Sequence, residues 1–154
     1  LLQLVNVATD VHDDFTEENN VYLPASWLAE VGVPQSSVLD PDRRDAVASV
    51  VERTADYAAT FVDDAERYLQ AMPLTRGNTL SAWGVPFLLA VGTLRELAGA
   101  PADALTERDV KVSRQEVFAV VSAISRADRE ELPELRATAA REPFHEASRP
   151  TPSD

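Results

Sequence analysis

The sequence predicts an all-α protein, and three observations lead to this class. Apolar residues recur at three- and four-residue steps along most of the 154 residues, which is the spacing of one helix face. Alternating runs of β-branched residues, the pattern of strands, are missing from the sequence. Capping residues and prolines stand where the periodic segments begin. The chain is long enough for one domain with a sizeable core, or for part of a larger domain.

Three helices are expected in the first half of the chain, over residues 1–16, 24–32 and 41–72. The sequence opens on Leu1 and already has the pattern of the middle of a helix, so we expect it to be the C-terminal part of a longer protein. Pro24 and Pro41 suit first helical positions, where a missing N–H costs nothing. One apolar stripe continues from Val47 to Met72 and predicts a single long helix.

Three more helices are expected in the second half, over residues 78–97, 113–124 and 132–140. The first of these is apolar on most sides, so we expect it in the core, with a kink at Pro86. Ser113 and Glu116 have the spacing of a capping box, in which each side chain bonds the backbone N–H of the other residue. The last residues are rich in Pro, Ser and charge. Residues 1–141 are therefore expected to form the C-terminal part of one domain, and residues 142–154 a disordered tail.

Charge and composition exclude several classes of function. Lys and Arg number 14 and Asp and Glu 26, so the net charge is −12, which would repel nucleic acid. Cysteine is absent, which excludes disulfides, thiolate zinc sites and cysteine nucleophiles. An acidic, alanine-rich sequence with a single lysine, Lys111, suggests a salt-adapted cytoplasm. The longest nearly apolar run, residues 82–94, is too short to span a bilayer and no signal segment opens the sequence, so we expect a cytoplasmic protein.

The beginning of the sequence carries the pattern with the most chemical content. At about 100° per residue, one face of the predicted helix is rich in oxygen atoms and the opposite face is apolar. The members of the oxygen-rich face are Gln3, Asn6, Asp10, Asp13, Asp14 and Glu17. Asp10 and Asp14 are one turn apart and Asn6 is one turn earlier, so their oxygen atoms can point at one spot. Hard cations such as Mg²⁺ bind such ligands, together with water and a substrate's phosphates.

The solvated face of an amphipathic helix has a similar pattern, but two observations favour a binding site. Residues 1–42 contain eight acidic residues and no Lys or Arg, so ion pairs within this segment cannot relieve the repulsion. Like charges at i and i+4 destabilise a helix unless a cation sits between them. Gln3 and Asn6 also stand among strongly apolar residues, which suits a cavity wall better than open solvent. We therefore interpret this face as a metal site.

Several strings of the sequence resemble one known family. Residues 2–14, LQLVNVATDVHDD, followed by VYLP at 21–24, closely resemble the second aspartate-rich motif of the squalene and phytoene synthases. The string WGVPFLLAVGTLR at 83–95 resembles the core helix that follows in those proteins, and VKVSR at 110–114 resembles their next element. The resemblance covers about residues 1–124, and the acidic composition is similar to that of an archaeal, halophile-type squalene synthase.

The resemblance implies an isoprenoid synthase fold and an Mg²⁺-dependent prenyl transferase. In this family, two aspartate-rich motifs bind Mg²⁺ and the diphosphates of two prenyl substrates, which are joined head to head through a cyclopropyl intermediate. Carried onto this sequence, Asp10 and Asp14 are the metal ligands and Asn6 assists the metal or the diphosphate, and these three are the implied catalytic residues. Asp13 takes the place of the family's Glu, and Gln3 borders the substrate site.

The resemblance also implies roles further along the chain. Tyr22 is expected near the diphosphate end of the site. Trp83 and Pro86 align with residues that wall the prenyl tunnel, and Tyr68 is a weaker candidate for the same tunnel. Lys111 aligns with a position that contacts the phosphate of NADPH in squalene synthases. Packing in the core, or solvation in the case of Lys111, is the competing interpretation for each of them.

The sequence departs from the family pattern inside the motif. Thr9 stands where the family often has Arg, and Asn19 and Asn20 stand where a basic residue commonly precedes the Tyr-Leu-Pro string. Some contacts to diphosphate must therefore come from elsewhere. The family's first aspartate-rich motif is absent from these residues, so we expect the missing N-terminal half of the same enzyme to complete the site. The 154 residues alone are accordingly expected to be inactive.

Three functions are compatible with the resemblance. The leading hypothesis is the condensation of two farnesyl diphosphates to squalene, with NADPH as the reductant. The enzymatic alternative is a phytoene synthase, which uses geranylgeranyl diphosphate, or a dehydrosqualene synthase; both lose a proton instead of being reduced. A non-catalytic protein of the same fold, acting in assembly or interaction, is the alternative from another class. Because the products dissolve in lipid, loose peripheral association with a membrane is also compatible with the sequence.

Overall fold

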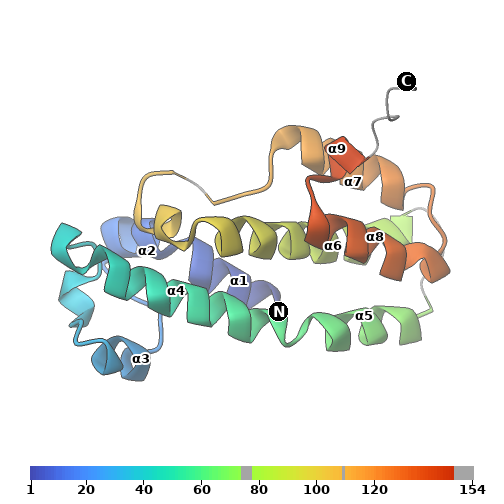
Figure 1. Cartoon of the computed structure of the whole chain (residues 1–154). Coiled ribbons are helices and arrows are strands. Elements are labelled where there is room, and N and C mark those ends of the chain that lie inside the picture. Colours follow the sequence, from blue (N-terminus) through green and yellow to red (C-terminus); the bar gives the residue numbers. More distant parts are fainter. Residues whose placement is uncertain (74–77, 109, 148–154) are drawn as a thin grey trace. The chain divides into compact units, whose positions relative to one another are not determined.

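The computed structural model describes residues 1–73, 78–108 and 110–147, and the regular structure within these residues is entirely helical (Figure 1). The predicted all-α class is therefore confirmed for the described part of the chain. The chain divides into two compact units, Leu1–Phe61 with Glu96–Lys111 and Val62–Arg95 with Val112–Asp154, and each unit is described by itself. Among the described helices, none is long and apolar enough to cross a membrane.

The first unit is organised around helix α4 (Arg44–Ala59), whose inner face carries small aliphatic side chains at helical spacing. Helix α1 (Leu2–Thr9) lies along α4, and the 3₁₀ helix η3 (Pro101–Leu105) contacts both α4 and α2 (Val11–Glu18) (Figure 1). The unit is completed by α3 (Ala25–Glu30) and the 3₁₀ helices η1 (Gln35–Ser37) and η2 (Pro41–Arg43). Val5, Ala8 and Val11 are buried, so this packing holds α1 and the acidic helix α2 by their apolar sides.

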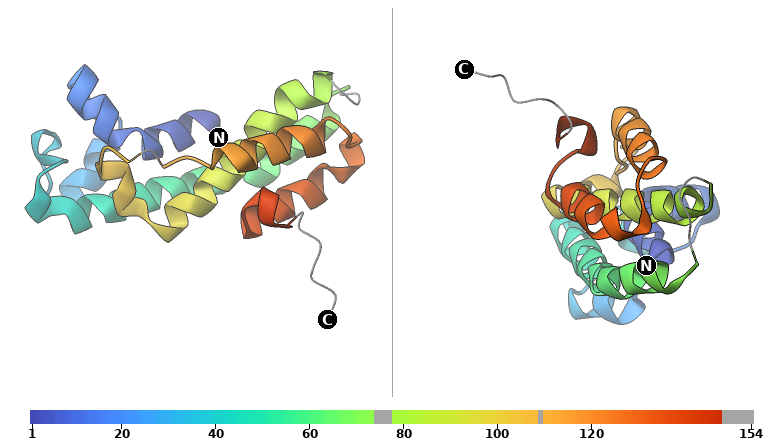
Figure 2. Two further views of the ribbon diagram at one scale, coloured as in Figure 1. Left: turned by 90° about the horizontal axis from the view of Figure 1, so that it is seen from above. Right: turned by 90° about the vertical axis from the view of Figure 1, so that its right-hand side faces the viewer.

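Two predicted helices are each divided in the structure. The expected helix over residues 1–16 breaks at Asp10, where φ is −96° and ψ is 17°, and the chain changes direction between α1 and α2 (Figure 2). The expected helix over residues 41–72 divides into α4 and α5 (Val62–Ala71). At this second break the Thr60 hydroxyl donates to the Tyr57 carbonyl, and such side-chain bonds compete with helical ones. The prediction of one continuous helix in each of these two segments was wrong. The apolar spacing continues across both breaks, so it did not reveal them.

The predicted helix boundaries in the first unit hold with small shifts. Pro24 is the N-cap of α3 instead of its first residue. Gly32 ends this helix with a φ of +69°, a left-handed conformation that glycine adopts without a steric cost. The N–H of Gly32 donates to the Ala29 carbonyl and that of Val33 to the Leu28 carbonyl, which is the Schellman arrangement. Pro41 occupies a first helical position as expected, although the helix there begins as the 3₁₀ turn η2.

The second unit contains α5, most of α6 (Asn78–Gly99), α7 (Arg114–Ile124), the 3₁₀ helix η4 (Arg129–Glu131), α8 (Leu132–Arg141) and α9 (Phe144–Ala147). Helix α6 continues through Pro86 and buries many of its side chains, as its apolar character predicted. Two glycines of α6 allow close approach by residues of α7 and the segment before it. A Cβ at Gly84 would lie 2.9 Å from Ile124 Cδ1, and one at Gly92 would lie 2.8 Å from Val112 Cγ1.

Two features near the C-terminus differ from expectation. Ser113 caps α7 by accepting the N–H of Glu116, but the Glu116 side chain forms no reciprocal capping bond and is buried. The capping box is therefore only half formed. Residues 142–154 were expected to be disordered, yet α9 follows α8 and its Phe144 is only 4% exposed. Contact of α9 with α7 and α8 explains the difference, because it buries the Phe144 ring. The sequence around Phe144 has no periodic apolar pattern that would have predicted this helix. The rest of the expected tail, residues 148–154, lies outside the described residues.

Candidate functional site

The oxygen-rich row predicted from the sequence is present in the first unit. The Asp10 N–H donates to the Asn6 carbonyl at 2.9 Å, and the Asp14 N–H donates to the Asp10 carbonyl at 2.8 Å. These helical bonds continue across the break at Asp10, so Asn6, Asp10 and Asp14 remain one turn apart along the chain. The one-turn backbone spacing that the sequence analysis expected for these three residues is therefore present, although it expected one unbroken helix.

Burial separates the two sides of these helices. Gln3, Asn6 and Asp13 are exposed, whereas Asp10 and Asp14 are half-buried. The His12 ring lies 3.1 Å from an Asp13 carboxylate oxygen, so Asp13 has a partner of its own beside the row. The two carboxylates of the row are thus partly shielded from solvent while still accessible to a ligand.

The electrostatics of the row indicate uncompensated negative charge. Partial burial, followed by the charges of Asp10, Glu18 and Asp13, raises the pKa of the Asp14 carboxyl above its ordinary value. Among the described residues, no Lys or Arg forms an ion pair with Asp10, Asp14 or Glu18. A bound cation would relieve this repulsion, because it favours the ionised form of both carboxylates.

The donor set fits a hard divalent cation that keeps part of its shell for water or substrate. Two carboxylates and one amide oxygen are the ligand types that Mg²⁺ prefers. Within residues 1–73, 78–108 and 110–147, no three Asp, Glu or His side chains are grouped closely enough to hold a metal ion among themselves. The row therefore fits a partial ligand set, which water and phosphate oxygens would have to complete.

One neighbour of the row makes a contact that the sequence analysis did not foresee. The Thr9 hydroxyl lies 2.8 Å from Asp10 Oδ1, to which it donates, and 3.2 Å from the Asn6 carbonyl. Thr9 was noted only as a departure from the family's Arg. In the structure it is a direct hydrogen-bond partner of a predicted metal ligand.

The other predicted site residues are distributed over both units. Tyr22 lies in the first unit, is 50% exposed, and donates its hydroxyl to Glu18 Oε2 at 3.1 Å. Lys111 also belongs to the first unit and is exposed. Tyr68 on α5 and Trp83 on α6 belong to the second unit and are 61% and 51% exposed, and Pro86 on α6 is exposed as well. These exposures exclude full burial in the core for Trp83 and Tyr68.

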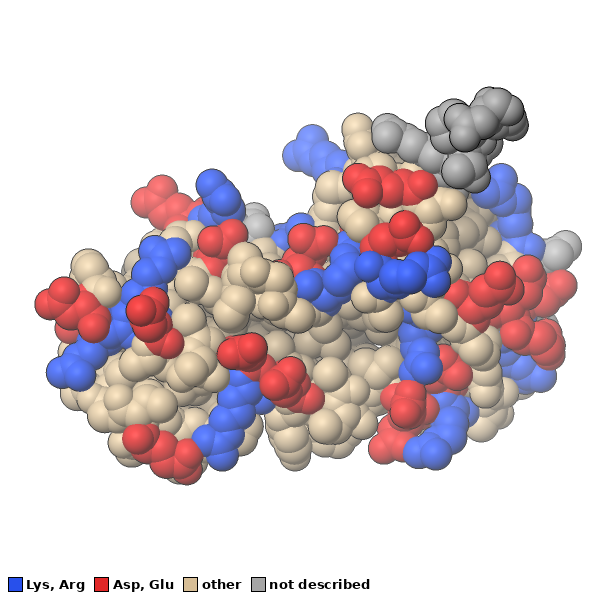
Figure 3. Space-filling model, viewed as in Figure 1, with Lys and Arg blue, Asp and Glu red and all other residues tan. Residues whose placement is uncertain are grey.

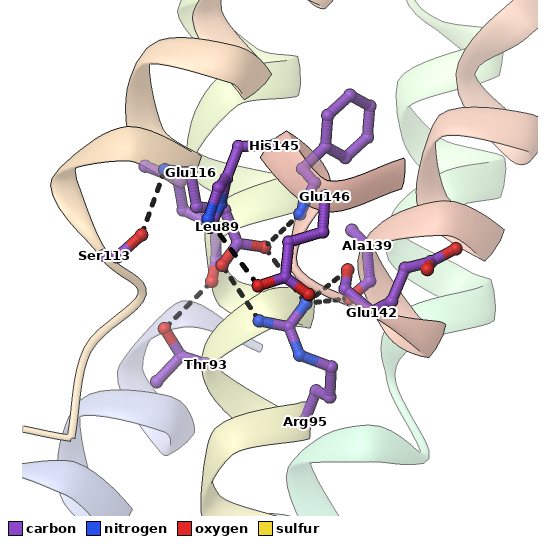
Figure 4. Close-up of polar contacts among 10 residues, drawn as sticks. Leu89, Thr93, Arg95, Ser113, Glu116, Ala139, Glu142, His145 and Glu146 are labelled. Atoms are coloured by element: carbon purple, nitrogen blue, oxygen red, sulfur yellow. Dashed lines mark hydrogen bonds and ion pairs between the residues drawn. The ribbon is translucent and has the colours of Figure 1, made fainter. Parts of the chain in front are cut away.

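The most strongly buried charged group in the described residues belongs to a cluster that the sequence analysis missed (Figure 4). The Glu116 carboxylate on α7 forms a two-bond ion pair with Arg95 on α6, with N–O distances of 3.0 and 2.9 Å. Arg95 also donates to the carbonyls of Ala139 and Glu142, and Glu116 accepts the Phe144 N–H. A signal was present, because Glu116 is in register with the buried Val120 and Ile124.

On the one face drawn in Figure 3, the described Lys and Arg side chains do not form a continuous basic area. Blue and red side chains alternate in Figure 3, and no large area of this face is covered by Lys and Arg alone.

Taken together, the chain is a helical protein whose most distinctive surface is an oxygen-rich row suited to a hard cation. The family description "Squalene/phytoene synthase" matches residues 1–116 of the 154. The chain therefore belongs to the squalene/phytoene synthase family, as the resemblance implied. No solved structure matches the chain significantly.

Individual relatives match a part of their own length. The 15-cis-phytoene synthases of Enterobacter agglomerans and Pantoea ananas are 36% and 32% identical over 83 residues, which are 54% of this chain and 26% and 25% of those proteins. A bifunctional lycopene cyclase/phytoene synthase of Podospora anserina is 34% identical over 100 residues, 64% of this chain and 16% of that protein. The matched region thus corresponds to about a quarter or less of each relative's length.

Proposed function

We propose that the protein condenses two prenyl diphosphates head to head, and that this chain supplies one of its magnesium sites. The observation that carries the proposal is the row of Asn6, Asp10 and Asp14, found in a member of the squalene/phytoene synthase family. The pKa of Asp14, raised first by partial burial and then by the charges of Asp10, Glu18 and Asp13, supports it further, because a bound cation would oppose both effects. Such a row costs stability in the absence of a cation, which is typical of a binding site.

The residues of this chain act by binding and orienting the leaving group. Asp10 and Asp14 would hold the cation, and the neutral Asn6 amide would add an oxygen ligand without adding charge. When bound, Mg²⁺ neutralises the charge that develops on a departing diphosphate. Gln3, one turn before Asn6 on the same exposed side, is able to hydrogen-bond the diphosphate or its water. Asp13 is already paired with His12, so it is the weaker candidate for direct contact.

Phytoene is the product that the comparisons favour. The leading hypothesis from the sequence was squalene, but the relatives described above are named phytoene synthases or contain a phytoene synthase. We therefore propose geranylgeranyl diphosphate as the substrate, with loss of two diphosphates and of two protons, one when the cyclopropyl intermediate forms and one at the end, and with no need for NADPH. Lys111, which was expected to contact the NADPH phosphate, then has no cofactor role. Tyr68, Trp83 and Pro86 remain proposed contacts for the prenyl chains.

Product analysis of the native-length protein tests this proposal. Purified protein is incubated with Mg²⁺ and either geranylgeranyl or farnesyl diphosphate, with and without NADPH, and the extracted lipids are separated by chromatography. The variants Asp10→Asn and Asp14→Asn are compared with Asp45→Asn, which removes the same charge from an exposed position on α4. Metal removal with a chelator, followed by addition of Mg²⁺, completes the series.

We expect phytoene from geranylgeranyl diphosphate, independent of NADPH. Its rate should be reduced by at least about a hundredfold in Asp10→Asn and Asp14→Asn and unchanged in Asp45→Asn, because only the first two lose a metal ligand. Squalene formed only with NADPH would show that the substrate is farnesyl diphosphate instead of geranylgeranyl diphosphate, while the proposed metal site would stand. No product from either substrate, with all variants alike, would contradict the enzymatic proposal and favour a non-catalytic protein of this fold.

A further inference from the structure

We infer that Thr9 is a positioning residue that orients the Asp10 carboxylate for the cation, an inference that rests on the proposed function of the row. The contact that carries it is the hydrogen bond from the Thr9 hydroxyl to Asp10 Oδ1, at 2.8 Å. The same hydroxyl lies 3.2 Å from the Asn6 carbonyl. A hydroxyl has one proton to donate, and a bond to an ionised carboxylate is the stronger of the two.

The bond leaves one carboxylate oxygen of Asp10 for a ligand. With Oδ1 accepting from Thr9, the plane of the carboxylate is fixed and Oδ2 is available to a cation. Hydrogen bonds to a metal ligand from a neighbouring side chain usually act in this way, by setting the ligand's orientation before the metal binds. Thr9 suits the task because it is half-buried and, being β-branched, has a restricted χ1 angle.

The backbone at Asp10 increases the need for such a partner. Asp10 stands at the break between α1 and α2, with φ −96° and ψ 17°, so the regular helix does not determine its side-chain direction. The Thr9 hydroxyl approaches both neighbours of the break, the Asn6 carbonyl on the preceding turn and the Asp10 carboxylate. Because Thr9 is the last residue of α1, its bond to Asp10 links the direction of the carboxylate to the end of that helix.

A neutral donor also preserves the charge of the row. The row has no ion pair with Lys or Arg among the described residues, and a hydroxyl orients Asp10 without neutralising it. A cation bound by Asp10 and Asp14 thus meets two full negative charges. Removal of the hydroxyl should weaken cation binding by disordering one ligand, while leaving the ligand itself in place.

The test compares Thr9→Val, which keeps the shape and removes the hydroxyl, with Thr9→Ser, which keeps the hydroxyl. The probe is Mn²⁺ alone, which accepts the same oxygen ligands as Mg²⁺. Its binding to the native-length protein is measured from the loss of the free-ion signal in electron paramagnetic resonance. Asp10→Asn serves as the variant that lacks the ligand, and a thermal melt of each protein checks folding.

We expect Thr9→Val to bind Mn²⁺ about tenfold more weakly than the wild type, within the range seen when the partners of metal ligands are removed. Thr9→Ser should bind within twofold of the wild type, and the Mg²⁺ concentration for half-maximal activity should change in the same order. Asp10→Asn should bind more weakly than Thr9→Val.

The outcomes separate this inference from the proposed function. If Thr9→Val binds Mn²⁺ like the wild type while Asp10→Asn does not, Thr9 has no positioning role and the metal site stands. Equal weakening in Thr9→Val and Thr9→Ser would also overturn the inference, because the hydroxyl would not be the cause. If the wild type fails to bind, or Asp10→Asn binds as well as the wild type, the site itself is wrong and the inference fails with it.

Discussion

At the scale of single residues, Glu116 is a buried charge whose side-chain partners come from distant parts of the chain. Its carboxylate is 2% exposed and accepts from the Arg95 guanidinium, 21 residues earlier, and from the Phe144 N–H, 28 residues later. Burial of a charge is tolerated only when a partner and hydrogen bonds compensate for the lost water. The pair therefore joins α6, α7 and α9. Removal of Arg95 leaves the Glu116 charge buried, and removal of Glu116 leaves the mostly buried Arg95 without this carboxylate.

Glu116→Ala is expected to lower the free energy of unfolding by about 3–5 kcal/mol, because Arg95 would be left buried without its carboxylate. Glu134→Ala, which removes an exposed acid from α8, should have an effect within about 0.5 kcal/mol. Denaturant unfolding of the native-length protein measures both. A double replacement, Arg95→Met with Glu116→Leu, should recover much of the loss, and an equal loss in the single and double variants would contradict this account.

Asp14 illustrates the opposite situation, a charge that the fold disfavours. Its pKa is raised by partial burial and by neighbouring acids, so the folded state binds the Asp14 proton more tightly than the unfolded state does. The stability that this proton contributes is fully present below pH 3.8, the ordinary pKa, and is lost as the pH rises through the raised pKa. Asp14→Asn should therefore stabilise the metal-free protein at neutral pH, by about 0.5 kcal/mol, the size of one or two like-charge pairs one turn apart. The same substitution removes a proposed metal ligand.

The measurement is the free energy of unfolding of the metal-free protein as a function of pH. The gain from Asp14→Asn should disappear as the pH falls below the pKa of Asp14, because the wild-type side chain is then neutral as well. Asp45→Asn should show no such gain at any pH. A gain that persists to the lowest pH would mean that packing, and not charge, causes the stabilisation.

At the scale of elements, α9 is the helix whose stability comes least from its own sequence. It has four residues, far fewer than an isolated helix needs in water, and it packs on α7 and α8. Its anchor is Phe144, whose N–H is bonded to Glu116 and whose ring is 4% exposed. The family match ends at Glu116, so α9 lies outside the matched residues. It is nevertheless bonded to the last matched residue through the Phe144 N–H.

Phe144→Ala is expected to cost about 3–5 kcal/mol of stability, the usual cost of deleting a buried ring. The matched control is Phe118→Ala on α7, where the ring is 75% exposed and the loss should be below about 1 kcal/mol. Hydrogen exchange of the α9 backbone amides should increase in Phe144→Ala alone. Equal losses in the two variants would mean that α9 is not docked in solution.

At the scale of the whole molecule, acidic charge is the dominant feature. The net charge of −12 produces repulsion that is screened at high ionic strength, since the Debye length falls from about 10 Å at 0.1 M salt to about 3 Å at 1 M. Residues 1–42, whose eight acids include Asp10, Asp13, Asp14 and Glu17, contribute a large share of this repulsion. Stability should therefore depend on salt.

The melting temperature is expected to rise by a few degrees between 0.1 M and 1 M KCl, because screening relieves repulsion in the folded state. The rise should be smaller in the triple variant Asp13→Asn, Asp14→Asn, Glu17→Gln, which removes three of the clustered charges. Differential scanning calorimetry at several salt concentrations provides the measurement. A rise of the same size in the variant would assign the effect to something other than this cluster.

The sequence by itself determined the helical class, most helix starts and the one-turn spacing of Asn6, Asp10 and Asp14. These features depend on residues within one or two turns of each other, so spacing and capping residues are sufficient to predict them. The family followed from the same local strings, and the match over residues 1–116 confirmed it.

Only the tertiary structure decided the breaks at Asp10 and Thr60, the pairing of Glu116 with Arg95, and the docking of α9. Apolar spacing continues across both breaks, and so it could not reveal them. Glu116 fits a local capping pattern equally well, but its actual partners lie 21 and 28 residues away. A buried charge is stabilised only where distant elements bring a partner to it, and the fold alone determines which elements meet.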